Sequence, residues 1–157
     1  MAAVATTWPH YEYQPSFVLG FHGCEKTVGE KLIRGTFRHL DHSRSDYDWL
    51  GHGIYFWEGN PERAMRWAQA RQKEGRIRNP FVLGAIIDLR RCLDLFDSAA
   101  LSLVAEAHQS LSRTIHAANA VMPQNTGSTS DRKARKLDCA TINYLHQYLE
   151  DQNIEPL

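Results

Sequence analysis

The segment at residues 17–24 decides the fold, and it reads FVLGFHGC. An apolar run of this length is typical of a buried strand. One polar ring, His22, interrupts the run, and Gly23 follows it directly. A glycine inside a strand often marks a place where a ligand or another backbone comes close. The segment therefore predicts a buried strand that carries a candidate binding side chain.

A related pattern follows at residues 51–56, which read GHGIYF, and it predicts a second strand over 53–57 with Tyr55 on it. The backbone beside Gly23 can bond an amide, and His22 can donate to a sugar hydroxyl. The ring of Tyr55 offers a face on which a planar group can stack. Taken alone, these residue types favour the alternative, in which His22 and Tyr55 are core residues of adjacent strands.

The remaining pattern begins with strands and short helices and ends with longer helices, which indicates an α+β fold. A helix is expected at 25–34, and another after Asn60, which can cap it, with Pro61 at the first helical position. Strands are expected at 81–89 and, after a kink at Arg90, at 92–96.

An apolar stripe with helical spacing over 101–115 then predicts a helix. Residues 122–136 carry no period and are predicted to form a mobile loop, dispensable for ligand binding. Asp138 is expected to cap a last helix, with its buried side formed by Thr141, Tyr144, Leu145 and Tyr148. The domain organisation expected is an extended N-terminal arm at 1–16 and one domain over 17–157, with a helical insertion at about 98–151.

Composition narrows the function classes. The 157 residues are 43% hydrophobic and 23% charged, which suits one folded domain. Basic and acidic residues balance to a formal net charge of zero, so a strongly basic nucleic-acid binder is not indicated. No apolar run is long enough to span a bilayer and no signal peptide is seen, so no membrane partner is expected. The three cysteines, Cys24, Cys92 and Cys139, are far apart, which favours a reducing, cytoplasmic setting.

The ordered pair of motifs resembles ADP-ribosyltransferases of the diphtheria-toxin and poly-ADP-ribose-polymerase type. His-Gly on a first strand and Gly-Ile-Tyr-Phe on a later one are similar to the first two elements of that family's His-Tyr-Glu signature. The stretch at 48–56, followed by the segments at 60–64 and 67–68, also looks like a bacterial, toxin-like branch of such domains. The resemblance covers about residues 17–90 and implies a split β-sheet flanked by helices. It implies NAD as the substrate and an unknown protein or nucleic acid as the acceptor.

Carried over to this chain, the resemblance gives residue roles. His22 would bond the adenosine ribose of NAD, the backbone of Gly23 would hold the nicotinamide carboxamide, and Tyr55 would stack on the nicotinamide ring. Arg38 lies where several members of the family meet the diphosphate, although a solvated loop arginine is an equal alternative. Trp67 would close the nicotinamide sandwich, with a core position in its helix as the alternative.

Three departures from the family pattern concern this site. The second stacking aromatic is expected about one turn into the helix after Tyr55, but that register holds Arg63 and Arg66, with Trp67 adjacent. Cys24 stands where many relatives have Ser or Thr, so a ribose contact is in doubt there.

The family's glutamate, which supports positive charge in the transition state, has no clear counterpart. Glu106 and Glu150 lie on predicted helices, and Glu155 lies near the terminus. The sequence therefore predicts an incomplete domain, with closing strands beyond 157 or on a second chain, that is catalytically silent by itself.

Three functions stay open. The first is NAD-dependent ADP-ribosyl transfer or NAD hydrolysis by a bacterial toxin or defence effector. The second is a degenerate or partial module that binds NAD or ADP-ribose without catalysis, and the third is an interaction fragment whose sheet edge is covered by another chain. No metal is expected, because no ligand spacing typical of a zinc site occurs.

Overall fold

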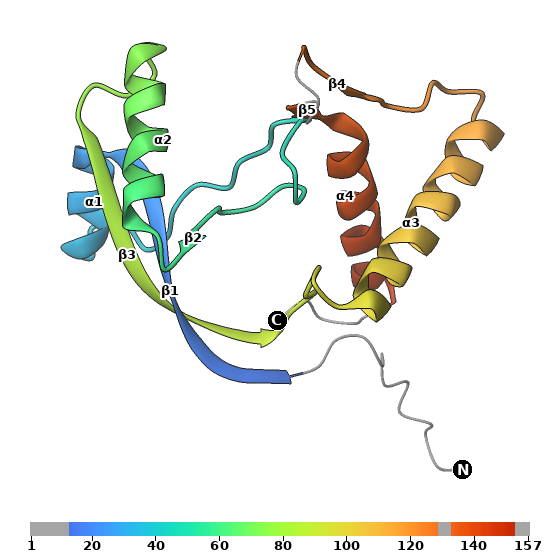
Figure 1. Cartoon of the computed structure of the whole chain (residues 1–157), viewed down its shortest axis with the longest axis horizontal. Helices are drawn as coiled ribbons and strands as arrows, with labels where there is room; N and C mark the ends of the chain where they lie inside the picture. The colour runs from blue at the N-terminus through green and yellow to red at the C-terminus, as the bar shows by residue number, and fades with distance from the viewer. Residues whose placement is uncertain (1–12, 129–132, 153–157) are drawn as a thin grey trace. The chain divides into compact units, whose positions relative to one another are not determined.

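The computed structural model describes residues 13–128 and 133–152, and within them the chain has an α+β fold (Figure 1). A three-stranded sheet, a two-stranded sheet and four helices make up this part of the chain. In chain order the elements are β1 (Tyr13–Glu25), α1 (Lys26–Ile33), β2 (Trp57–Glu58), α2 (Pro61–Lys73), β3 (Pro80–Arg91), α3 (Ser98–Ala117), β4 (Asn125–Thr126), β5 (Ala134–Arg135) and α4 (Lys136–Asp151).

The chain divides into two compact units. Unit 2 consists of Pro15–Ser43 and Gly53–Leu89, and unit 1 holds Arg44–His52 together with the residues from Arg90 onward. The helical segment expected at about 98–151 lies entirely in unit 1.

Unit 2 is built on a sheet with the strand order β2-β1-β3. Strand β2 pairs antiparallel to β1, with Gly20 opposite Glu58 and Phe21 opposite Trp57. Strand β1 begins at Tyr13, so residues 13–16 belong to it and not to a separate arm, while residues 1–12 lie outside the described part. The expected strands at 17–24 and 81–89 are confirmed as parts of β1 and β3.

Helix α2 begins at the cap that the sequence indicates. Asn60 accepts a hydrogen bond from the backbone of Arg63 at 2.9 Å, and Pro61 is the first helical residue, as expected. Fully buried Ala64 and Ala68 form the inward face of α2. At the end of β1, the carboxylate of Glu25 accepts from the backbone of Arg78 at 2.7 Å, and this bond ties β1 to the start of β3.

In unit 1 the core is the contact between α3 and α4, which pack side by side (Figure 1). Its buried members are Leu103 and Ala107 from α3 and Leu145 and Leu149 from α4. The helix expected over 101–115 is confirmed as α3. The expected buried side of α4 is only partly right, because Tyr148 is 46% exposed, whereas Cys139, Ile142 and Leu149 are buried.

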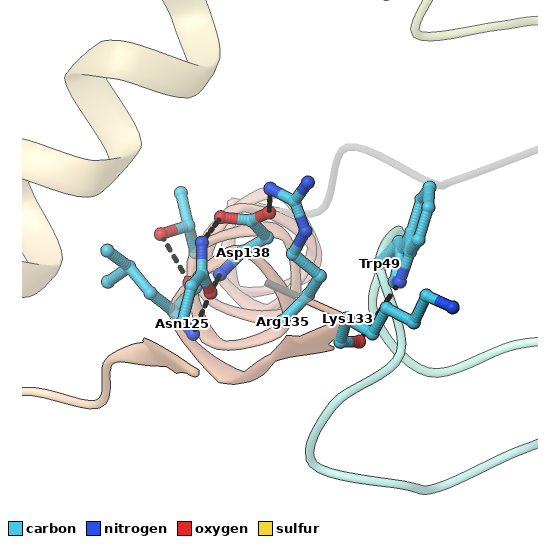
Figure 2. Close-up of polar contacts among 7 residues, drawn as sticks. Trp49, Asn125, Lys133, Arg135 and Asp138 are labelled. Atoms are coloured by element: carbon cyan, nitrogen blue, oxygen red, sulfur yellow. Dashed lines mark hydrogen bonds and ion pairs between the residues drawn. The ribbon is translucent and has the colours of Figure 1, made fainter. Parts of the chain in front are cut away.

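Residues 122–136 are not the uniform mobile loop that was predicted. Asn125–Thr126 and Ala134–Arg135 pair as antiparallel strands β4 and β5, and residues 129–132 between them lie outside the described part. The side-chain oxygen of Asn125 accepts from the backbone of Leu137 at 2.9 Å, and its amide donates to Asp138 at 2.6 Å (Figure 2). Asp138 is therefore not the cap of α4, as was expected. Asn125, which lies outside the helix, accepts from the first backbone amides of α4 instead.

Two further strand assignments are corrected. Within the segment at 53–57, Gly53 forms an isolated bridge with Ser43 and only Trp57 joins a strand, so Tyr55 lies in irregular chain. Residues 92–96 form no strand. The kink before them is real, since Arg90 has a φ of 43°.

No helix in residues 13–128 or 133–152 combines the length and the apolarity that crossing a bilayer requires.

The role of Asn125 predicts a stability effect. Changing Asn125 to Ala removes the acceptor for the first amides of α4, and losing such a cap costs about 1 kcal/mol, with a range of roughly 0.5–2. Urea unfolding followed by circular dichroism should show a lower midpoint. Gln124→Ala, an exposed neighbour, is the matched control, and equal midpoints for the two variants would contradict the capping role.

Candidate functional site

All six residues singled out from the sequence lie in unit 2, and two of them meet directly. Nδ1 of His22 lies 2.7 Å from the backbone carbonyl oxygen of Tyr55. This bond sits just past Phe21↔Trp57, one of the two residue pairs that join β1 to β2. The backbone pairing of β1 with β2 ends at Phe21 and Trp57. Next to it, the hydrogen bond from the His22 side chain holds the irregular chain at Tyr55 against β1.

The bond to Tyr55 assigns the two nitrogens of His22. A carbonyl oxygen only accepts, so Nδ1 of His22 carries the proton that is donated to it. In the neutral ring Nε2 is then an acceptor. This changes the sequence-based expectation: neutral His22 can accept a hydrogen bond from a hydroxyl through Nε2, whereas donation from Nε2 requires the protonated ring.

Gly23 is buried where helix α2 crosses β1. A Cβ atom at this position would lie 2.4 Å from the carbonyl oxygen of Ala64 and 3.2 Å from the ring of Trp67. Glycine is therefore required for the helix to pack here. Helix α2 covers the side of Gly23 on which a side chain would stand. A ligand could therefore contact Gly23 only through its backbone N–H or C=O group.

Trp67 packs into the contact between α2 and the sheet. Its ring centroid lies 6.4 Å from that of His22 and 6.0 Å from that of Trp57. The guanidinium of Arg71 stands over the Trp67 ring, 5.0 Å from its centroid. These neighbours favour the alternative in which Trp67 is a packing residue, and they place it beside His22.

Cys24 and Arg38 occupy opposite environments. Cys24 is 6% exposed, and Gly29 of α1 comes close to its sulfur. Burial raises the pKa of the Cys24 thiol, so it stays protonated and is a poor nucleophile. A thiol buried against α1 argues against the NAD contact that the resemblance implies. Arg38 is exposed in the irregular chain after α1, where a solvated arginine needs no ligand.

Tyr55 itself is half-buried. Next to it, the ring of Phe56 lies 5.6 Å from that of His22 and tilted by 55°. The segment at 55–57 thus meets β1 through the carbonyl of Tyr55, the ring of Phe56 and the strand pairing of Trp57.

None of the carboxylates that the sequence left as candidates belongs to the described residues of unit 2. Glu106 and Glu150 are exposed on α3 and α4 of unit 1, and Glu155 lies outside the described residues. In the described part of the chain no cluster of histidine, cysteine and carboxylate side chains has the makeup of a metal site.

Comparison with known proteins gives no match, whether the chain is set against family models, curated proteins or solved structures.

Sequence reasoning missed the polar residues that hold the irregular segments in place. Glu25 accepts from the backbone of Arg78 and Asn79, and these bonds lower the pKa of its carboxyl group. Asn143 of α4 accepts from the backbone of His52 at 2.8 Å. Partners so far apart in the chain leave no local signal. The one usable hint was Gly51, whose φ of 78° favours glycine.

The packing at Gly23 predicts a contrast between two glycines. Gly23→Ala forces the new methyl into the backbone of α2, and overpacking of this kind costs about 1–3 kcal/mol. At Gly53 a Cβ meets nothing within 4 Å, so Gly53→Ala should stay within about 0.5 kcal/mol of the wild type. Chemical denaturation of both variants tests this, and a Gly23→Ala protein as stable as Gly53→Ala would show that α2 does not approach β1 this closely.

Proposed function

We propose that this chain binds NAD at the edge of β1 beside Tyr55, and that its protein transfers ADP-ribose from NAD to an acceptor or to water. The fold would then be an ADP-ribosyltransferase-like split sheet, of which the described residues form a part. The single observation that carries the proposal is the bond from His22 to the Tyr55 carbonyl, because it joins the two motifs that the resemblance rests on.

The chemistry of His22 suits the role. With Nδ1 engaged by Tyr55, Nε2 is the nitrogen left to meet a ribose hydroxyl, and a hydroxyl can donate to it. The contact with Tyr55 also orients the ring, so little side-chain freedom remains to be lost on binding.

The aromatic segment suits the other end of NAD. The ring of Tyr55 can stack on nicotinamide, and a backbone edge at Gly23 can bond the carboxamide. Trp67 lies beside His22 as packing support, which leaves Tyr55 as the stacking residue.

Transfer needs more than binding. The bond between nicotinamide and ribose breaks with positive charge developing at the anomeric carbon, and a nearby carboxylate stabilises that charge. Glu106 and Glu150 are exposed on helices of the other unit. This observation favours a second candidate function for the chain by itself, in which it holds NAD or ADP-ribose without turnover.

Binding of NAD tests the proposal. Wild-type protein should bind NAD by calorimetry, and His22→Asn should bind roughly five- to tenfold more weakly. The shorter amide can still donate to Tyr55 but offers no group at the position of Nε2, and one lost hydrogen bond is worth about 1 kcal/mol. His39→Asn, an exposed histidine of the same unit, is the matched control.

The same binding assay tests whether the aromatic ring of Tyr55 contributes to NAD affinity. Tyr55→Ala should weaken binding more than Tyr55→Phe, because phenylalanine keeps the aromatic face. If the wild type does not bind NAD, or if His39→Asn weakens binding as much as His22→Asn, the proposed site is wrong.

Turnover is expected to be absent. Residues 1–157 alone should release no nicotinamide above the rate of spontaneous hydrolysis, because no carboxylate is assigned to the site to stabilise positive charge at the anomeric carbon. Nicotinamide release measured by chromatography is the readout. Steady release that is abolished by Glu106→Gln or Glu150→Gln would place the missing carboxylate on α3 or α4 and refute the non-catalytic alternative.

A further inference from the structure

A groove of about 290 Å³ lies between α3 and α4, and both helices belong to unit 1. All of its lining residues come from these two helices, which pack side by side (Figure 1). The buried side chains of Leu103, Ala107 and Leu145 contribute its apolar lining. Sites for small molecules typically have volumes of roughly 300–1,000 Å³. The groove therefore suits a small molecule with an apolar stem, and it is too small for a folded segment.

Hydroxyl groups and a guanidinium gather at one end of this groove. Nη2 of Arg113 donates to the hydroxyl oxygen of Ser110 at 3.3 Å. Opposite them, the hydroxyl group of Tyr144 from α4 lies 3.5 Å from that of Thr114. Hydroxyl groups can donate as well as accept, and a guanidinium only donates. This end of the groove can therefore offer several donors to one acceptor group.

The same groups stabilise negative charge. Hydrogen bonding with Ser110 and Thr114 lowers the pKa of Tyr144, and the positive charge of Arg113 acts in the same direction. A tyrosine pKa is lowered where the surroundings favour the anion over the neutral hydroxyl. A planar guanidinium matches the two oxygens of a carboxylate. The chemistry at Arg113 therefore suits a carboxylate.

The opposite charge stands further along the groove. Glu106 also lines it, seven residues before Arg113 on α3. This spacing is two helical turns, about 10 Å of rise, so both side chains lie on the same side of the helix. Neither Glu106 nor Arg113 takes part in an ion pair with a residue of the described part of the chain. The groove thus presents one acidic and one basic group to a ligand, with apolar surface nearby.

We propose that the groove between α3 and α4 binds a small zwitterion of the ω-amino carboxylate class. Its carboxylate pairs with Arg113, its ammonium group pairs with Glu106, and its aliphatic stem lies against the apolar lining. This site lies in unit 1 and uses none of the residues proposed to bind NAD, so the two proposals stand or fall separately.

The first experiment titrates the whole chain with three probes that share one stem length. The zwitterion ε-aminocaproate carries both charges, caproate carries only the carboxylate, and hexylamine carries only the ammonium group. The zwitterion should bind about fivefold more tightly than either of the others by calorimetry, because each of them lacks one charge pair. Absence of binding, or equal affinity for all three probes, overturns the proposal.

Charge-removing variants assign the two ends. Arg113→Gln should weaken binding of ε-aminocaproate about fivefold and leave hexylamine binding unchanged. Glu106→Gln should weaken the zwitterion equally and leave caproate binding unchanged. Arg44→Gln and Glu150→Gln are the matched controls, since both residues are exposed in unit 1 and lie outside the lining of the groove.

The pattern across probes separates the pairing from a general loss of structure. If Arg113→Gln weakens all three probes equally, or if a control variant matches its partner variant, the assigned pairing is wrong. Should a variant fail to fold, amide shifts of the wild type decide. Shifts at Ser110 and Tyr144 that are larger with ε-aminocaproate than with caproate or hexylamine support the site, and shifts confined to unit 2 overturn it.

Discussion

The close approach of α2 to β1 sets the geometry of the candidate site. At Gly23 the strand and the helix come so near that a single methyl group would strike the carbonyl of Ala64. Ala64 and Ala68 have no exposed surface, because the helix turns its smallest side chains to the sheet. With the helix this close, the large ring of Trp67 is pressed beside His22. Gly23, which suggested a ligand contact in the sequence, is thus required for the packing of α2 on β1. The same packing fixes which groups near Gly23 a ligand could contact.

Local patterns predicted the elements that local forces form. The apolar run of β1, the cap at Asn60 and the helical stripe of α3 are signals within a few residues, and each gave the right element. Strands β2, β4 and β5 have two residues each, which is too short for any period to show. Strand β2 pairs with the much earlier β1, whereas β4 and β5 pair with each other. Neither pairing leaves a periodic signal in two residues, so the sequence predicted a strand at Tyr55 and a loop at Asn125.

The sequence identified the residues of the candidate site but not the hydrogen bond between them. His22 stood out because a polar ring interrupts an apolar strand. That its Nδ1 proton goes to the Tyr55 carbonyl depends on a backbone turn that no pattern reveals. The motif at 48–56 also appears continuous in sequence, yet it divides between units after His52. Its first half serves to hold a loop on α4, and only its second half carries the ring that the resemblance singles out.

The division of the chain has a consequence for its synthesis. Unit 2 uses only residues up to Leu89, whereas the loop at 44–52 contacts α4, and Asn143 follows His52 by 91 positions. A ribosome that has released residues 15–89 has released everything unit 2 needs, and domains generally fold as they emerge. The loop must then wait for α4 to leave the exit tunnel. For several seconds of translation, at about 5–20 residues per second, Gly51 and its neighbours lack the surface they fit, and during that interval the nascent chain is most open to proteases and chaperones.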